Sequence, residues 1–312
     1  MTDSSRTLDV CNLEFQWPDE EMQIGEYTFV PVEDYETRYL NLQHLVTVHG
    51  GHHGTVEACT GTHQITGTIV CPEEHRVAAL GWGHEIPTEL DDILLLLSLF
   101  TRRKVFALDP GEEEPVVIAD PRMFHYGGGL RLSLGKVKRE NESGHEDYSI
   151  DLQGGVGNVN QLIRSTAWRS TYGQGSFVLL FVAACHRQIL ETSFLLCWTI
   201  WEHLYAQLHA GQKTMKHIAK THAREKISHI LQRYGVRQSV PAAHEQKLKE
   251  LVKMRNLLVH DGRLPSEDSQ EVADIFVRLT EMILAVILGL SPSNVFSAEE
   301  RFDRFLNNQQ LI

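Results

Sequence analysis

The sequence predicts an α+β protein in which a mainly β N-terminal domain precedes an all-α helical bundle. Two observations predict this fold class. Residues 8–150 alternate short β-prone runs with Gly, Pro and acidic turns, as strands joined by loops do. From Ser176 onward the pattern is helical almost without interruption. The chain has 312 residues, and because single cores usually stop growing at roughly 250–300 residues, two domains are expected.

The N-terminal half contains one helix-like segment among its strand-like runs. The runs YTFVPV, HQITGTIVC and PVVIAD are typical of strands. Residues 91–105, DDILLLLSLFTRRKV, open on acids and close on a basic cluster, as a helix dipole favours. We therefore expect residues 1–150 to form a β-rich domain that carries one prominent helix.

A change of composition predicts the boundary between the domains. Between about 135 and 175 the chain becomes polar and Gly-rich, which is typical of exposed loops. We place linker or boundary loops at 151–175 and a helical domain at 176–312. Periodicity, capping residues and glycines predict helices at 176–209, 213–234, 241–260, 267–288 and 297–310.

The cysteines and the apolar segments predict a cytoplasmic protein that does not span a membrane. The N-terminus is polar and acidic and lacks the order of a signal peptide. The longest apolar stretch, 177–185, is far shorter than the roughly 20 residues that a bilayer requires, so we expect a buried helix. An odd number of cysteines without CxxC spacing indicates reduced and mostly buried thiols: Cys11, Cys59, Cys71, Cys185 and Cys197.

The charge distribution is uneven. A net charge of −12 argues against broad, nonspecific affinity for nucleic acid. Between Ala210 and His260, however, eleven Lys and Arg face three acids, a net charge of +8 that leaves −20 for the rest. This basic stretch is either an RNA track or the solvated face of a helix pair. As a group, its candidates for RNA binding are Arg224, Lys226, Arg233, Lys247 and Lys253.

A His-rich segment in the first half raises the possibility of a zinc centre. Residues 49–63 contain four histidines with Glu57 and Cys59, all of which are possible ligand types. Because His52 and His53 are adjacent and no spacing matches the usual paired motifs, we interpret the segment as a solvated loop. We predict no metal and no cofactor, and a metalloenzyme remains a third hypothesis that metal analysis would test.

Near the C-terminus, the run KMRNLLVHDGRL places Arg255, Asn256 and His260 within an apolar helical pattern. Asn256 and His260 are four residues apart and share a helix face. Arg255 and His260 are five apart and differ by about 140° around the helix. One helix therefore cannot easily direct both side chains at one phosphorus, unless His260 lies at a frayed end or two helices face each other.

Two interpretations of these three residues are open. They can be an ordinary helix end, with Arg255 as a surface cation and His260 near a C-terminus that suits its charge. Alternatively, a neutral His can accept a proton from a 2′-hydroxyl, while an Arg holds the phosphate bidentately. Metal-free RNA cleavage needs those two functions.

The run Arg255–His260, RNLLVH, resembles the R-x4-6-H motif of the HEPN superfamily, in which Asn commonly follows the Arg. The motif lies late in an all-α region, between the apolar run FLLCWTIWEHL at 194–204 and an amphipathic helix. Residues 176–290 are similar to the Apea-like HEPN group. The segment LLSLFTRRKV is reminiscent of the β-rich N-terminal domain that often precedes that group in bacterial defence proteins.

The resemblance implies a homodimer with a composite ribonuclease site that needs no metal. His260 would act as general base or acid, Arg255 would contact the scissile phosphate and Asn256 would position one of them. Glu202 occupies a place comparable to that of a supporting polar residue in the family. The products would carry a 2′,3′-cyclic phosphate and a 5′-hydroxyl.

The same resemblance implies a cytoplasmic toxin-like effector or an abortive-infection effector of anti-phage defence. Its partners would be RNA, a second copy and a phage-derived or cellular trigger at the N-terminal domain. The alternative is a non-catalytic HEPN module that dimerises and binds RNA, a nucleotide or a protein. Of the other polar or aromatic residues, we interpret Trp198 and Trp201 as core and His217, His222 and His229 as surface.

Overall fold

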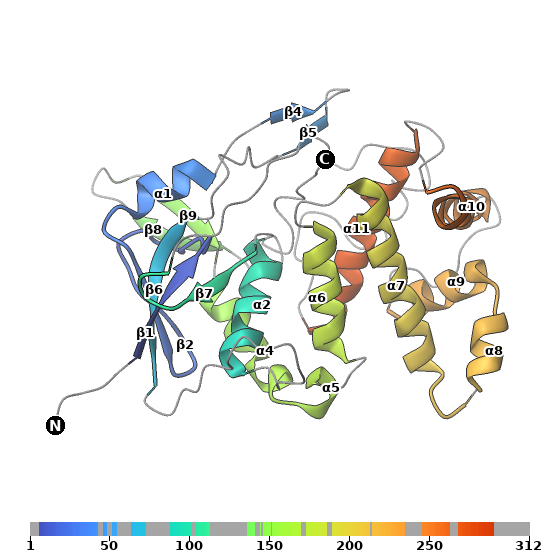
Figure 1. Cartoon of the computed structure of the whole chain (residues 1–312), viewed down its shortest axis with the longest axis horizontal. Coiled ribbons are helices and arrows are strands. Elements are labelled where there is room, and N and C mark those ends of the chain that lie inside the picture. Colours follow the sequence, from blue (N-terminus) through green and yellow to red (C-terminus); the bar gives the residue numbers. More distant parts are fainter. Residues whose placement is uncertain are drawn as a thin grey trace. The chain divides into compact units, whose positions relative to one another are not determined.

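A computed structural model of the chain has the α+β composition that the sequence predicts (Figure 1). The chain forms two compact units, residues 1–178 and 179–312. The structure describes residues 6–42, 46–48, 52–54, 64–72, 88–101, 104–112, 136–140, 144, 146–150, 152–169, 173–185, 189–212, 214–234, 245–262 and 268–289.

Five strands of the N-terminal unit form one antiparallel sheet in the order β2-β3-β6-β1-β7. The central strands β6 and β1 bury Ile69 and Val10, and β3 buries Phe29. Two further antiparallel hairpins are β4 (Val46–Val48) with β5 (His52–Gly54), and β8 (Lys136–Glu140) with β9 (Glu146–Ile150). The sheet consists of β1 (Arg6–Cys11), β2 (Met22–Ile24), β3 (Tyr27–Pro31), β6 (Ile65–Cys71) and β7 (Phe106–Leu108).

The predicted helix at 91–105 is α2, which runs from Glu89 to Thr101. Thr88 and Asp91 cap it reciprocally, since the Thr88 N–H donates to Asp91 Oδ2 (2.7 Å) and the Asp91 N–H to Thr88 Oγ1 (3.2 Å). The Val105 N–H donates to Ser98 Oγ at 2.9 Å, so the chain turns back on the end of the helix. The other helices of this unit are α1 (Tyr35–Leu42), α4 (Leu152–Ile163) and α5 (Thr166–Arg169).

The expectation of linker loops at 151–175 is wrong, because α4 and α5 occupy most of that segment. The Gly-rich run LQGGVGN is helical, and Leu152, Val156 and Ile163 are buried. Helix α4 packs against α2 and β2. Tertiary packing therefore overrides the unfavourable helix propensity of its glycines.

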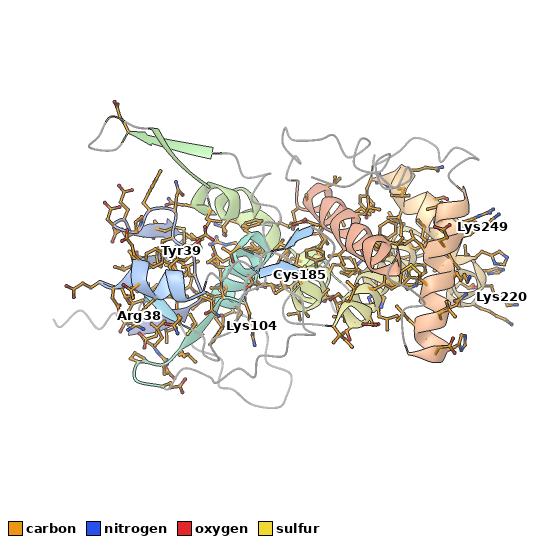
Figure 2. All side chains as sticks on the ribbon, turned by 90° about the horizontal axis from the view of Figure 1, so that it is seen from above. Arg38, Tyr39, Lys104, Cys185, Lys220 and Lys249 are labelled. Atoms are coloured by element: carbon orange, nitrogen blue, oxygen red, sulfur yellow. The ribbon has the colours of Figure 1, made fainter. Side chains whose placement is uncertain are left out.

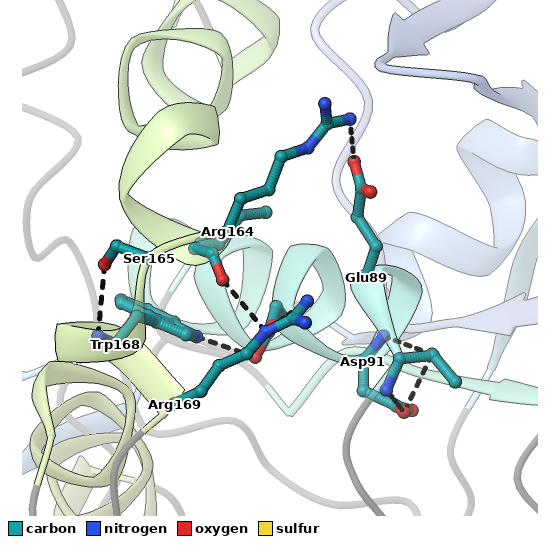
Figure 3. A network of polar contacts seen from close by, with 9 residues as sticks. Glu89, Asp91, Arg164, Ser165, Trp168 and Arg169 are labelled. Carbon is teal, nitrogen blue, oxygen red and sulfur yellow. Dashed lines mark hydrogen bonds and ion pairs between the residues drawn. The ribbon is translucent and has the colours of Figure 1, made fainter.

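A polar network joins the first turn of α2 to α5 (Figure 3). The Trp168 Nε1–H donates to Asp92 Oδ1 at 2.7 Å, and Arg169 Nη2 lies 3.6 Å from Asp92 Oδ2. Arg164 Nη2 pairs with Glu89 Oε1 at 2.6 Å. Burial raises the pKa of Asp92, against the opposing effects of the Trp168 hydrogen bond and the Arg169 cation.

The C-terminal unit is helical in the residues that the structure describes. Helix α7 packs against α8, α9, α10 and α11, so it is the centre of this unit (Figure 1). Trp201 and Phe194 of α7 stack on Phe276 of α11 at ring-centroid distances of 4.9 and 5.1 Å. The helices are α6 (Gln174–Cys185), which crosses the boundary between the units, α7 (Leu190–Leu208), α8 (Met215–Lys220), α9 (Ala223–Arg233), α10 (Glu245–Asp261) and α11 (Asp268–Ile287).

Two of the expected helices are each divided in two. The expected helix 176–209 ends at Cys185 and begins again at Leu190, after the extended residue Ile189. The expected helix 213–234 is interrupted by extended backbone at Thr221 and His222, which separates α8 from α9. The expected helix 297–310 lies outside the described residues.

Several expectations about burial are confirmed where the structure describes the residues. Trp198 and Trp201 are buried, as are the side chains of Cys11, Cys71, Cys185 and Cys197. Cys59 lies outside the described residues. Within the described part of the chain, no helix has the length and apolar character needed to cross a bilayer.

Strand β6 requires glycine at Gly67, and we expect Gly67→Ala to destabilise the N-terminal unit. An added Cβ would lie 2.5 Å from Phe15 Cζ and 2.6 Å from the Val30 carbonyl oxygen, and a backbone oxygen cannot move aside cheaply. Overpacking of this kind typically costs about 1–3 kcal/mol. The midpoint of urea unfolding, followed by circular dichroism, should fall.

The matched control for this substitution is Gly157→Ala on α4, where an added Cβ meets nothing within 4 Å. Replacing a mid-helix Gly by Ala should raise stability by about 0.5–1 kcal/mol. Equal effects of the two substitutions would contradict the steric account of Gly67.

We expect the free energy of unfolding to fall as pH rises from the ordinary Asp92 pKa of 3.8 through its raised value in the folded protein. The folded protein holds this proton more tightly than the unfolded chain, so protonation favours the folded state and the contribution is lost above the raised pKa. Asp92→Asn keeps an acceptor for Trp168 and should remove this component. Urea midpoints across about pH 4 to 7 measure it.

The wild type and Asp92→Asn are compared at every pH, so that only the difference between their two curves is attributed to Asp92. A wild-type curve parallel to that of Asp92→Asn would show that Asp92 does not titrate in this window.

Candidate functional site

A surface groove of about 1090 Å³ lies between α9 and α10 in the C-terminal unit. Small-molecule pockets usually enclose roughly 300–1,000 Å³, so a nucleotide and its neighbours could enter this groove. It is lined from both helices by polar and charged side chains over the apolar residues Leu248, Val252 and Leu257. Its composition therefore suits a ligand that is both charged and partly apolar.

Helix α10 contributes one stripe of side chains to the groove. Lys249, Lys253, Asn256 and His260 all line it and follow one another at intervals of four, three and four residues. Side chains at this spacing lie on one face of a helix. Figure 2 shows Lys249 pointing outward from the ribbon. The opposite face is held in the core by Leu251, Met254 and Leu258.

Helix α9 contributes a second stripe. Arg224, Ser228 and Gln232 line the groove and are four residues apart, whereas Ile227, Ile230 and Leu231 are buried on the other side. The N-cap residue of α9, His222, also lines the groove. Its imidazole makes no capping hydrogen bond. The break between α8 and α9 is therefore what brings a second histidine to this site.

The groove carries more positive than negative charge. Arg224, Lys249 and Lys253 supply three cations, and Glu225 and Asp261 supply two carboxylates. His222 and His260 add one positive charge each when protonated. A phosphate entering the groove would therefore meet a locally cationic surface on an otherwise acidic chain.

Arg255 does not line the groove. It is half-buried on the neighbouring side of α10, and its Nη1 donates to Asn256 Oδ1 at 3.0 Å. The structure thus brings together two of the three residues that the motif singled out, Asn256 and His260. The third is separated from His260 by its position around the helix, as their five-residue spacing requires.

Glu202 lies in an ion pair between helices and is not among the residues that line the groove. Lys226 of α9 donates to Glu202 Oε2, and Trp198 Nε1 donates to Glu202 Oε1 at 3.3 Å. The Lys226 ammonium also lies 5.8 Å from the ring centroid of Tyr205, and its side chain is only 10% exposed. This pair anchors α9 to α7, which leaves Lys226 facing inward.

The other basic residues expected to contact RNA have different positions. Arg224 and Lys253 line the groove, while Arg233 is exposed on α9 but is not among the lining residues. Lys247 lies within α10, and its side chain is outside the described part of the structure. Lys249 belongs to the groove although the sequence did not single it out.

The three histidines that we interpreted as surface residues differ from one another. His217 is exposed, and its Nδ1 lies 2.8 Å from Thr214 Oγ1. His229 is half-buried, with its ring centroid 4.8 Å from that of His209 and 5.6 Å from that of Tyr205. His222 is exposed and faces the groove.

The His-rich segment 49–63 falls mostly outside the described residues, which include only the backbone of β5 from it. Among the residues that the structure does describe, no three His, Cys, Asp or Glu side chains are grouped as a metal site requires. No protein-family model, curated protein or solved structure matches this chain. The side chains of the groove are therefore the basis for assigning a function.

We expect Glu202→Ala to lower the stability of the helical unit, because it leaves the inward-facing Lys226 ammonium without its carboxylate. Loss of a hydrogen bond to a charged group typically costs about 1.5–3 kcal/mol. Thermal unfolding followed by circular dichroism should show a lower midpoint. Glu202→Gln, which keeps an acceptor, should lose less.

Lys249→Ala is the matched control, since Lys249 is an exposed cation of the groove. Exposed substitutions of this kind usually change stability by less than about 0.5 kcal/mol. A Glu202→Ala protein as stable as Lys249→Ala would contradict the structural role of the ion pair.

Proposed function

We propose that this protein is a metal-independent endoribonuclease that cleaves RNA by 2′-hydroxyl transesterification in the groove between α9 and α10. The observation that carries the proposal is the gathering of Asn256 and His260 with three cations along one groove. An imidazole is suited to proton transfer near neutral pH, and cations stabilise charge that develops on a phosphate.

Each part of the groove has a role in this chemistry. His260 would transfer a proton to or from a reacting oxygen, and Asn256 would hydrogen-bond the ribose or the phosphate. Lys253, Lys249 and Arg224 would bind the phosphates on either side of the scissile bond. The products would be a 2′,3′-cyclic phosphate and a 5′-hydroxyl, with no metal in the reaction.

A homodimer would supply an arginine to the groove, because the Arg255 of the same chain does not line it. Arg255 lies beside the groove, and on the same side of α10 Val259 leaves 53% of its surface exposed. In the proposed dimer Val259 would lie in the contact between the two copies. With the two α10 helices apposed, the partner's Arg255 would reach the phosphate bound near His260.

The biological role proposed here follows from the resemblance of RNLLVH and its helical context to the HEPN superfamily. The protein would be a cytoplasmic toxin-like or anti-phage effector, in which the N-terminal unit senses a trigger and restrains the nuclease. Uncontrolled cleavage of RNA would harm the cell that produces it, so a restraint is needed.

One observation favours a second candidate, a non-catalytic module that binds RNA or another anion. Arg255 is engaged with Asn256 by a 3.0 Å hydrogen bond, so neither side chain is held ready for a phosphate in the single chain. The cationic groove would bind RNA equally well without cleaving it.

We expect purified wild-type protein to cleave total cellular RNA in EDTA and His260→Ala to do so about 10²–10⁴-fold more slowly, since that is the usual contribution of a proton-transferring group. End-group analysis should find 2′,3′-cyclic phosphates. His217→Ala removes an exposed histidine outside the groove and should cleave like the wild type.

Two outcomes would decide against the nuclease. Full activity of His260→Ala would remove the groove from the reaction. RNA binding without any cleaved product, lost on Lys249→Ala and Lys253→Ala, would establish the binding module instead.

A further inference from the structure

Transesterification moves two protons, and a single histidine accounts for only one of them at a time. One group must accept the proton of the 2′-hydroxyl while another donates a proton to the departing 5′-oxygen. Lys and Arg side chains are protonated at neutral pH and are weak proton donors there. The proposed function therefore leaves one role of the reaction unfilled.

Two histidines of the same chain face the groove from different helices. His260 comes from the last turn of α10, and His222 is the N-cap residue of α9. Both imidazoles are exposed to solvent within the groove. Nothing in the local structure of α9 requires a histidine at this cap, because the side chain makes no capping hydrogen bond. Ser, Thr, Asp or Asn would be the usual choice there.

We propose that His222 is a catalytic residue that forms a proton-transferring pair with His260 inside one chain. This inference rests on the ribonuclease activity proposed above and adds the second proton-transferring group. The cations Arg224, Lys249 and Lys253 line the same groove as the pair. A phosphate bound by these cations would lie in the groove that both imidazoles line.

We assign His260, in the last turn of α10, as the proton donor and His222, at the start of α9, as the proton acceptor. The leaving-group experiment tests this order directly. The charged groups that share the groove with the two imidazoles are Arg224, Glu225, Lys249, Lys253 and Asp261.

The reaction then balances within the groove. His222 takes the proton from the 2′-hydroxyl, the 2′-oxygen forms a bond to phosphorus, and the bond between phosphorus and the 5′-oxygen breaks. His260 gives its proton to the 5′-oxygen. The products are the 2′,3′-cyclic phosphate and a 5′-hydroxyl end, and proton exchange with water restores both imidazoles. The partner's Arg255 would add binding of the phosphate without taking part in proton transfer.

A leaving-group experiment on the full chain tests this assignment. Wild type, His222→Ala, His260→Ala and the control His217→Ala are assayed in EDTA on a uridine-containing RNA dinucleotide. They are assayed in parallel on the 4-nitrophenyl ester of uridine 3′-phosphate. The nitrophenolate leaves without a proton, so the second substrate needs an acceptor but no donor. Circular dichroism checks that each variant is folded.

We expect both groove variants to lose about 10²–10⁴-fold in rate on the dinucleotide. On the nitrophenyl ester His260→Ala should approach the wild-type rate, whereas His222→Ala should remain slow. The rate of the wild type on the dinucleotide should depend on pH in a bell-shaped profile. The profile of each variant should lack one of the two limbs of that bell.

The failures of the two proposals are distinguishable. Wild-type rates of His222→Ala on both substrates, with His260→Ala still defective, would overturn the pair and leave the ribonuclease standing. If His222→Ala approached the wild-type rate on the ester and His260→Ala stayed slow, the assignment of donor and acceptor would be overturned. A wild-type protein inactive on the dinucleotide, the ester and total RNA would overturn the ribonuclease and the pair together.

Discussion

Burial of one face each of α9 and α10 against the rest of the helical unit determines which side chains face the groove. Helix α10 is held by Leu251, Met254 and Leu258, and the ion pair of Lys226 with Glu202 anchors α9 to α7. Once those faces are buried, the 3.6-residue period of the helix determines the direction in which each remaining side chain points. The stripes that line the groove are thus a consequence of core packing.

The same constraint separates Arg255 from His260. Their five-residue spacing puts them on different sides of a helix whose orientation the core has already set, and no rotation can present both to one ligand. In the proposed reaction the second proton-transferring group would therefore come from another helix, and His222 of α9 lines the same groove. In the proposed dimer, Arg255 would bind the phosphate from across the interface.

Much of this architecture was predictable from the sequence, and the exceptions have physical reasons. Periodicity is a strong signal, so α2 and α10 were expected close to their observed limits. The glycines of α4 concealed a helix whose buried Val156 and Ile163 compensate for poor propensity. The spacing of Asn256 and His260 sufficed to put them on one face. The sequence did not identify His222 as a site residue, because no local signal predicts the helix break at Thr221 and His222. That break places His222 at the groove.

The charge of the groove makes ligand binding and proton binding interdependent. With both histidines neutral, the three lining cations exceed the two lining carboxylates by only one charge. Protonation of His222 and His260 would triple that excess. An anion that binds more tightly to the protonated groove must, by linkage, favour its protonation. Acidic conditions would then strengthen RNA binding and at the same time remove the proton acceptor of the proposed reaction. On the acid side of the pH optimum, affinity and turnover in this groove should therefore depend on pH in opposite directions.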